Sequence, residues 1–495
     1  MTALVAAPAR ARSGAAGATG RQLVVFELRR FARSPVLWAA VALTVAWRLY
    51  DAWGWLPDMT VETIGAANAS AIVAVAALVV ANLATSRDRR QGAPATLAAL
   101  PRRAVDRTRA VALAAPVAGA AAAAIAIAAC LAARWASGPV AGRFDAYEAL
   151  SGVAVAALAA AAGVALGRWL PALVVAPLAG LLWLFGLLAN SRGEYGGWLL
   201  PVIPSYEPDW GPRSSGWHLV YLCALVVLVA AVALFRHGVR PLRVAAALAA
   251  LAVAVPAVSA AGHAPDQQMR ILNRVYDAVD ARRAGLYGDR CRQIDGISYC
   301  ALPRYVSWTA AWAEAVHPVV AALPPGARTG LPAVRQTNVT FSALVAPALP
   351  VLLNWSTDPG QGHRAWLAGG MAAAAVRLGP ECDARGRAGT LVALWLLGQA
   401  GPVPPPGPLM VEGLQPASAI NRYYGAAEAG YARRLLARAD TRQRIWASWD
   451  RLADPRTTLD QALPLLGLRP ERFPADPPAD VAAVCRFEPE TGGRG

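Results

Sequence analysis

Residues that could do catalytic chemistry are few in this chain, and their spacing matches no established catalytic motif. None of the five histidines belongs to a His-Glu-x-x-His pattern, which would place two zinc ligands on one helix face. No serine lies in a Gly-x-Ser-x-Gly turn, which would expose a nucleophile. All 47 basic residues are arginine, so the chain lacks the lysine that a Walker-A phosphate loop requires. We therefore expect no catalytic residue, no metal, no cofactor and no ATPase activity in this chain.

The composition indicates a membrane protein. Hydrophobic residues make up 56% of the 495 residues and charged residues 16%, against roughly 25% charged in soluble domains. A membrane-spanning helix needs about 20 mostly apolar residues. A buried helical hairpin of a soluble protein would not produce seven such runs in a row, so we predict seven spans. They are Val36–Trp55, Gly65–Thr85, Ala110–Ala133, Ala149–Leu166, Leu170–Asn190, Trp217–Phe235 and Val244–Gly262.

Charge near the predicted spans predicts their orientation. Seventeen arginines lie in the N-terminal stretch and in alternate loops, whereas the opposite loops hold four. Because arginine-rich loops stay in the cytoplasm, we expect a cytoplasmic N-terminus and an extracytoplasmic segment from residue 263 onward. Arg48, beside three tryptophans at the end of the first span, is expected to reach the lipid headgroups. No small-residue cleavage site follows the first apolar run, so it should remain as an anchor in the cell membrane.

The second half of the chain differs in character. Its apolar runs Phe341–Leu353, Trp366–Val376 and Thr390–Ala400 are about a dozen residues long, which suits core helices better than bilayer spans. Helical spacing recurs over Met269–Leu286. We therefore predict an all-α chain with four parts. These are a cytoplasmic N-terminus (1–34), a transmembrane domain of six spans (35–243), a seventh span (244–262) and a mostly helical extracytoplasmic domain (263–495).

Four of the six cysteines fall in the predicted external domain. An even number of cysteines in an oxidising compartment indicates disulfides. Cys291 and Cys300 bracket a short polar segment, which leaves Cys382 to pair with Cys485. The alternative is a metal site, but the close Cys-x-x-Cys spacing that such a site requires is absent.

The basic segment Ser86–Arg109 could be interpreted as a nucleic-acid patch. It lacks the interleaved aromatic residues on which bases stack, and its position between two predicted spans already explains its charge. We therefore expect no nucleic-acid partner. The arginines of this segment are expected to contact anionic membrane lipid instead.

Three patterns in the first half resemble permease subunits of the ABC-2 class of ATP-binding-cassette transporters. An arginine-rich amphipathic stretch entering the first span is similar to the family's interfacial elbow helix; its charged residues are Glu27, Arg29, Arg30 and Arg33. Leu23, Phe26, Arg30 and Phe31 are expected along the headgroup boundary. A second pattern is similar to the cytoplasmic loop that docks onto the ATPase; its residues are Asp88, Arg89, Arg90, Gly92 and Pro101. This chain has Ala93-Pro94 where the family more often has Thr and Glu.

The third pattern is Gly163-x-x-x-Gly167-Arg168-Trp169-Leu170-Pro171, at the predicted inner turn between the fourth and fifth spans. The resemblance covers about residues 1–240, and it implies a six-helix core, pairing with a second permease chain as a homodimer or heterodimer, and a separate ATPase subunit. The seventh span and the external domain depart from the family plan. Since the spans carry few acidic residues, an apolar or amphiphilic substrate is expected. The alternative is a membrane-anchored receptor or assembly protein that acts through its external domain.

Overall fold

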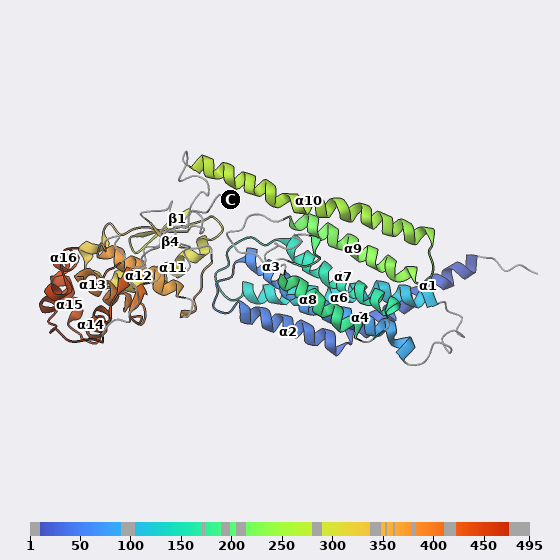
Figure 1. Ribbon diagram of the computed structural model, residues 1–495, viewed down its shortest axis with the longest axis horizontal. Coiled ribbons are helices and arrows are strands. Elements are labelled where there is room, and N and C mark those ends of the chain that lie inside the picture. The colour runs from blue at the N-terminus through green and yellow to red at the C-terminus, as the bar shows by residue number, and fades with distance from the viewer. Residues whose placement is uncertain are drawn as a thin grey trace, which may run out of the picture. The chain divides into compact units, whose positions relative to one another are not determined.

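The computed structural model describes the chain in several stretches. They are residues 10–90, 104–170, 172, 174–189, 199–203, 214–279, 290–336, 348–351, 354–359, 362–378, 383–409 and 422–474. The chain divides into two compact units (Figure 1). Unit 1 comprises Met1–Trp53, Asp58–Gly138 and Arg143–Asp277. Unit 2 comprises Gly54–Pro57, Pro139–Gly142 and Ala278–Gly495.

The described part of unit 1 is helical. Its helices are α1 (Arg10–Ala32), α2 (Pro35–Asp51), α3 (Met59–Ala69), α4 (Ala71–Arg90), α6 (Ala104–Trp135), α7 (Ala146–Trp169), α8 (Val175–Ala189), α9 (Ser215–Phe235) and α10 (Pro241–Val279). Three of them begin at capping side chains, because the first N–H groups of a helix need acceptors. Ser34 accepts from Leu37 N, Asp58 from Thr60 N, and Asp145 from Tyr147 N.

Within the described part of the chain, five helical stretches are long and apolar enough to cross a membrane. They are Met59–Arg87, Ala104–Trp135, Ala146–Trp169, Ser215–Phe235 and Pro241–Gly262. They match the second, third, fourth, sixth and seventh predicted spans. The first and fifth predicted spans correspond to the shorter helices α2, with 17 residues, and α8, with 15. Helix α10 continues beyond Gly262 to Val279, so the predicted end of the seventh span lies within a continuous helix.

Contacts at the helix ends define how the chain runs through unit 1. Ser215 Oγ at the start of α9 lies 3.2 Å from the Asp145 carboxylate that caps α7. At the other end, Trp169 Nε1 donates to Val232 O over 3.0 Å. Helices α7 and α9 therefore run parallel, and the chain must return between them through the segment that contains α8. Ser214 Oγ donates to Ala261 O, so α10 runs antiparallel to α9.

Small residues allow α7 to pack closely against its neighbours. A Cβ atom at Gly163 would lie 2.2 Å from Leu78 O of α4, and one at Gly167 would lie 3.0 Å from Asn82 O. A Cβ at Gly152 would lie 2.8 Å from Ala67 Cα of α3. Close backbone approach through small residues is how helices pack when lipid replaces water as the solvent. The Gly163-x-x-x-Gly167 pattern is therefore a packing interface between α4 and α7.

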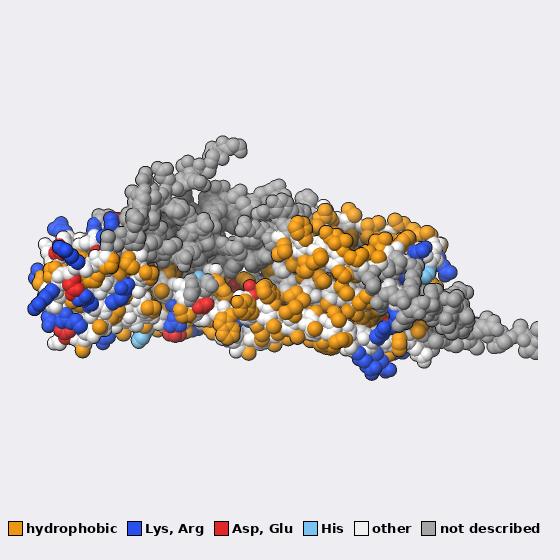
Figure 2. Space-filling view, turned by 60° about the horizontal axis from the view of Figure 1, so that its bottom comes forward, with side chains coloured by type: hydrophobic (Ala, Val, Ile, Leu, Met, Phe, Trp, Pro, Cys, Tyr) orange, Lys and Arg blue, Asp and Glu red, His pale blue; other side chains and the backbone are white. Residues whose placement is uncertain are grey.

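The outer surface of unit 1 is apolar (Figure 2). Trp47 and Tyr50 of α2, Leu188 of α8 and Leu248 and Val255 of α10 are all more than half exposed. Such an extended apolar surface is rare on soluble proteins and is what a membrane-spanning bundle presents to lipid.

Unit 2 contains β-sheet as well as helix, so the all-α prediction is wrong for this part of the chain. Strands β1 (Arg290–Ile294), β2 (Ile297–Ala301), β3 (Val334–Gln336) and β4 (Leu349–Val351) form one sheet in that order. The first pair is antiparallel and the other two pairs are parallel. Strands β5 (Gly407–Leu409) and β6 (Arg422–Tyr424) form a second, antiparallel pair.

The helices of unit 2 are short and pack around a buried centre. They are α11 (Thr309–Ala322), α12 (His363–Ala375), α13 (Ala388–Leu397), α14 (Ala426–Leu436), α15 (Thr441–Ala447), α16 (Trp449–Leu452) and α17 (Leu459–Leu465), with 3-10 turns at Val306–Trp308 and Pro325–Arg328. All ten residues of α13 are buried. Helices α12 and α13 confirm two of the three predicted core helices. The end of the third, Phe341–Leu353, forms strand β4 instead.

Two short segments that lie between helices of unit 1 in the sequence belong to unit 2. From Gly54–Pro57, Leu56 N donates to Trp355 O over 2.8 Å, and Gly54 O accepts from Thr357 N over 2.7 Å. From Pro139–Gly142, Pro139 O accepts from the Trp308 indole over 2.8 Å. Ala141 N donates to Pro57 O over 2.9 Å, which joins the two segments. Unit 2 is therefore built from three stretches of the chain.

Candidate functional site

The predicted elbow region forms the C-terminal part of α1. Its charged residues divide between two faces: Arg29, Arg30 and Arg33 are exposed, whereas Glu27 is buried. Phe26 is 58% exposed, as the interfacial prediction requires, but Phe31 is 5% exposed and packs in the core of unit 1. The prediction that Phe31 lies at the headgroup boundary is therefore wrong. Glu27 and Phe31 are four residues apart, so they share the inward face of the helix.

Glu27 connects this helix to the start of the predicted docking loop. Its Oε1 lies 3.5 Å from Arg87 Nη2 of α4, and both side chains are largely enclosed. Helix α4 continues to Arg90, so the backbone of Asp88, Arg89 and Arg90 forms its last turn. The side chains of these three residues, and all of Gly92 and Pro101, lie outside the described residues. Sequence reasoning identified Glu27 but missed Arg87, its partner in the structure.

A second charged group lies at the opposite end of α3–α4. Glu62, in the first turn of α3, accepts from Arg48 Nη2 of α2 over 2.8 Å and from Arg134 Nε of α6 over 2.7 Å. The side chains of all three residues are 7% exposed or less. Arg48 also pairs with the exposed Asp51 over 2.8 Å. We call Arg48, Glu62 and Arg134 the buried ion cluster.

The buried ion cluster corrects the prediction for Arg48. This guanidinium lies inside unit 1 and does not extend outward to headgroups. Gly65 makes room for it, since a Cβ atom there would lie 2.7 Å from Arg48 Nε. The sequence carried a hint, because Arg48 and Arg134 both lie at the ends of apolar runs, in regions where arginine is otherwise sparse. Ionisable groups within a membrane bundle usually pair with one another, as they do here.

Arginines gather around His237 in the turn between α9 and α10. The pKa of His237 is lowered, first by burial and then by the positive charges of Arg168, Arg243, Arg236 and Arg107. His237 Nε2 lies 2.8 Å from Thr108 Oγ1 of α6. A lowered pKa favours the neutral imidazole, which can share a hydrogen bond with the hydroxyl without adding another positive charge.

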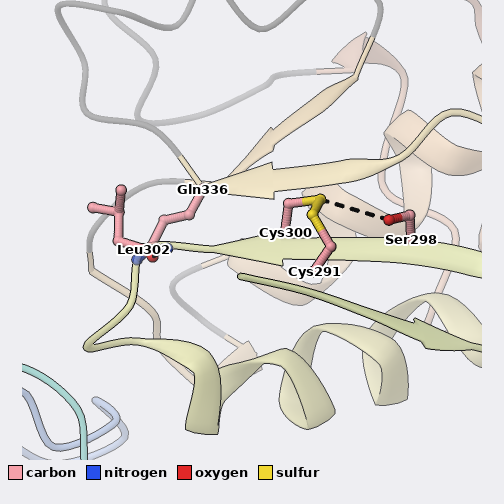
Figure 3. Close-up of a disulfide and its surroundings, with 5 residues drawn as sticks. All are labelled: Cys291, Ser298, Cys300, Leu302 and Gln336. Atoms are coloured by element: carbon pink, nitrogen blue, oxygen red, sulfur yellow. Dashed lines mark hydrogen bonds between the residues drawn. A yellow bond between two sulfur atoms is a disulfide. The ribbon is translucent and has the colours of Figure 1, made fainter. Parts of the chain in front are cut away.

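The predicted disulfide between Cys291 and Cys300 is confirmed (Figure 3). Its two cysteines face each other across the β1–β2 hairpin, not across a loop. Cys382 and Cys485, the other predicted pair, lie outside the described residues. Cys130 and Cys223 of unit 1 are free thiols.

Three histidines occupy structural positions. His218 lies 3.2 Å from Val202 O. His317 pairs with Asp295 on the surface, and His363 packs edge-on against Trp55 and Trp355. Within the described stretches of the chain, no three His, Cys, Asp or Glu residues lie close enough together to hold a metal ion.

No protein-family model, curated protein or solved structure matches this chain. The function of this chain is therefore inferred from its sequence patterns and from the geometry of unit 1.

Proposed function

We propose that this chain is the permease subunit of an ATP-binding-cassette transporter, energised by a separate ATPase subunit. The observation that carries the proposal is the Glu27–Arg87 ion pair. It joins α1, which resembles an elbow helix, to α4 directly before the segment that resembles an ATPase docking loop. Force applied to that segment would therefore reach both helices together.

Helix α4 offers a path from that end of unit 1 to the other. It follows α3 after a single residue, Ser70, and Glu62 of α3 joins the buried ion cluster. Closure of two ATPase subunits would displace α4 and α1, and the cluster would carry the displacement to α2 and α6. In the described spans the enclosed side chains are mostly alanine, valine and leucine. Such a lining suits an apolar or amphiphilic substrate better than an ion.

Seven crossings fit the course of the chain better than five. The parallel course of α7 and α9 requires a return between them, which supports the fifth crossing. Helix α2 follows α1 after two residues and ends at the buried ion cluster, so it runs between the same two ends of unit 1 as α3–α4. Its 17 residues correspond to about 26 Å, which a bilayer accommodates by local thinning.

The composition of unit 2 supports the proposed orientation. With a cytoplasmic N-terminus and seven crossings, Gly54–Pro57, Pro139–Gly142 and the chain from Ala278 onward all emerge on the extracytoplasmic side. These are the three stretches from which unit 2 is built. The Cys291–Cys300 disulfide suits the same oxidising compartment.

The alternative function is that of a membrane-anchored receptor or assembly protein. The observation in its favour is that unit 2 incorporates two inter-helix segments. A domain that is merely tethered by one helix needs no such connections. In this alternative, unit 2 would carry the function and would use the helices as a rigid base.

Purification in mild detergent with associated proteins distinguishes the two functions. We expect an ATP-binding subunit to co-purify in a stoichiometric ratio and to hydrolyse ATP. The Glu27→Gln variant should insert normally but lower ATP-dependent transport at least tenfold, whereas Arg29→Gln, on the exposed face of the same helix, should leave transport unchanged. An intact chain that purifies without an ATPase would contradict the transporter function and favour the alternative.

A further inference from the structure

Six arginines converge at one end of unit 1 from three separate elements. Arg107 and Arg109 lie in the second turn of α6, and Arg168 lies at the end of α7. Arg236, Arg240 and Arg243 lie in and after the turn between α9 and α10. Four of them lie close enough to His237 to lower its pKa, in addition to the larger effect of its burial: Arg107, Arg168, Arg236 and Arg243. Arg240 lies in the same turn, where its carbonyl accepts from Arg243 N over 2.9 Å. Figure 2 shows basic side chains gathered at this end of the unit. We call these six residues the arginine cluster.

Arg236, Arg240 and Arg243 place three positive charges within eight residues. Asp106 lies 3.5 Å from Arg109 and pairs with it. Like charges that lie this close repel one another, so the arrangement is stable only beside compensating negative charge.

Arg243 is a second, independent observation that points to a missing acceptor. Its side chain is buried, and Nη1 donates to Leu234 O over 2.8 Å and to Gly238 O over 2.7 Å. Nε and Nη2 are enclosed and find no acceptor in the described part of the chain. A buried guanidinium N–H without an acceptor is costly, and a phosphate oxygen is the acceptor whose geometry suits arginine best.

Apolar side chains beside the arginine cluster indicate what kind of molecule carries the phosphate. Trp169 is 48% exposed, Val239 76% and Leu242 82%. The Arg236 guanidinium lies 5.8 Å from the centre of the Trp169 ring. A soluble phosphate makes no contact with apolar side chains, whereas a phospholipid has acyl chains next to its phosphate. Tryptophan and arginine together are typical of the headgroup level of a bilayer.

We propose that the arginine cluster binds the phosphate of an anionic phospholipid headgroup, with Trp169 and Leu242 against the first carbons of the acyl chains. None of its residues is among those of the proposed docking segment. It depends on unit 1 lying in a membrane and not on transport.

Native mass spectrometry of the full chain in detergent tests the site. Phosphatidylglycerol and phosphatidylcholine are added in turn, and the fraction of protein that retains lipid is measured. We expect phosphatidylglycerol to be retained preferentially. The Arg236→Gln/Arg240→Gln variant should bind it about thirtyfold more weakly, since each arginine near a headgroup contributes about 1 kcal/mol.

The matched control is Arg442→Gln/Arg451→Gln, which removes the same charge from exposed positions of unit 2 and should bind phosphatidylglycerol normally. Equal losses in both double variants would mean a diffuse charge effect and would overturn the site. So would equal retention of the two lipids. Inorganic phosphate that binds the lipid-free protein as tightly as phosphatidylglycerol would identify a soluble ligand and overturn the lipid assignment.

Discussion

Glu62 links three helices of unit 1 through its carboxylate. The two oxygens accept separately from Arg48 and Arg134, so the two enclosed guanidinium groups share one negative charge. Pairs of this kind contribute less than their Coulomb attraction suggests, because both charges have lost water. Removing one member is nevertheless costly, since the remaining charge stays buried without compensation.

We therefore expect Glu62→Gln to lower the free energy of unfolding by about 3–5 kcal/mol. Cys130, 1% exposed and one turn before Arg134, provides a local readout. Its alkylation in the folded protein, quantified by mass spectrometry, should become faster in the variant. The control is Asp51→Asn, which removes the exposed partner of Arg48 and should cost at most about 1 kcal/mol. Equal effects of the two substitutions would mean that the buried cluster contributes no more than a surface pair.

Gly163 supports a prediction of a different kind, because it depends on space and not on charge. An added Cβ atom would lie 2.2 Å from Leu78 O, so α4 and α7 would have to separate. Gly163→Ala should lower the free energy of unfolding by about 1–3 kcal/mol, the usual cost of overpacking. Thermal unfolding in detergent measures it. Gly186→Ala in α8, where nothing lies within 4 Å, should be neutral or slightly stabilising. A fully stable Gly163→Ala variant would show that the interface is loose.

At the scale of elements, the helices were predictable where their apolar runs were long. The strands of unit 2 were not, because four of the five residues of β1 are exposed and its apolar pattern is weak. The Asp295-Gly296 pair is nevertheless a sequence signal for a hairpin turn. Both residues have positive φ, 51° and 80°, which is the backbone that a two-residue hairpin turn requires. The Asp295-Gly296 pair alone therefore predicts a hairpin for the segment between the two cysteines.

The hairpin changes what loss of the Cys291–Cys300 bond should do. Closing so short a ring stabilises the folded state by about 2–3 kcal/mol through loop entropy. Strand β2 also pairs with β3, and Ile297, Tyr299 and Ala301 are buried in the core, so β2 should remain in place without the bond. Strand β1, paired with β2 alone, should separate first.

The Cys291→Ser/Cys300→Ser variant tests this order. Hydrogen exchange should show faster opening of Arg290–Ile294 than of Ile297–Ala301. The Cys223→Ser variant, which removes a free thiol of unit 1, is the control for general effects of cysteine loss. Uniform loss of protection across the whole sheet would mean instead that the disulfide holds unit 2 together.

At the scale of the whole molecule, the sequence predicted the order of apolar segments but not the contacts that join distant ones. The resemblance to an elbow helix identified Glu27 and the arginines around it, yet an ion pair between residues 27 and 87 follows only from the folded chain. The buried ion cluster joins residues 48, 62 and 134 for the same reason. The contribution of residues 54–57 and 139–142 to unit 2 was equally hidden, because neither segment has a distinctive composition.

The topology prediction draws on both the charge pattern and these contacts. Ala136 and Val239 are exposed residues in the turns after α6 and α9, respectively. Seven crossings with a cytoplasmic N-terminus place Ala136 outside the cell and Val239 inside it. Single substitutions Ala136→Cys and Val239→Cys, in a Cys223→Ser background, allow each position to be probed with a membrane-impermeant maleimide. On intact cells only the Ala136→Cys variant should react, and permeabilised cells should label both. Reaction of both variants in intact cells would mean that an odd number of crossings does not separate these turns. Reaction of the Val239→Cys variant alone would reverse the orientation and would place the Cys291–Cys300 disulfide in a reducing compartment, where it would not persist.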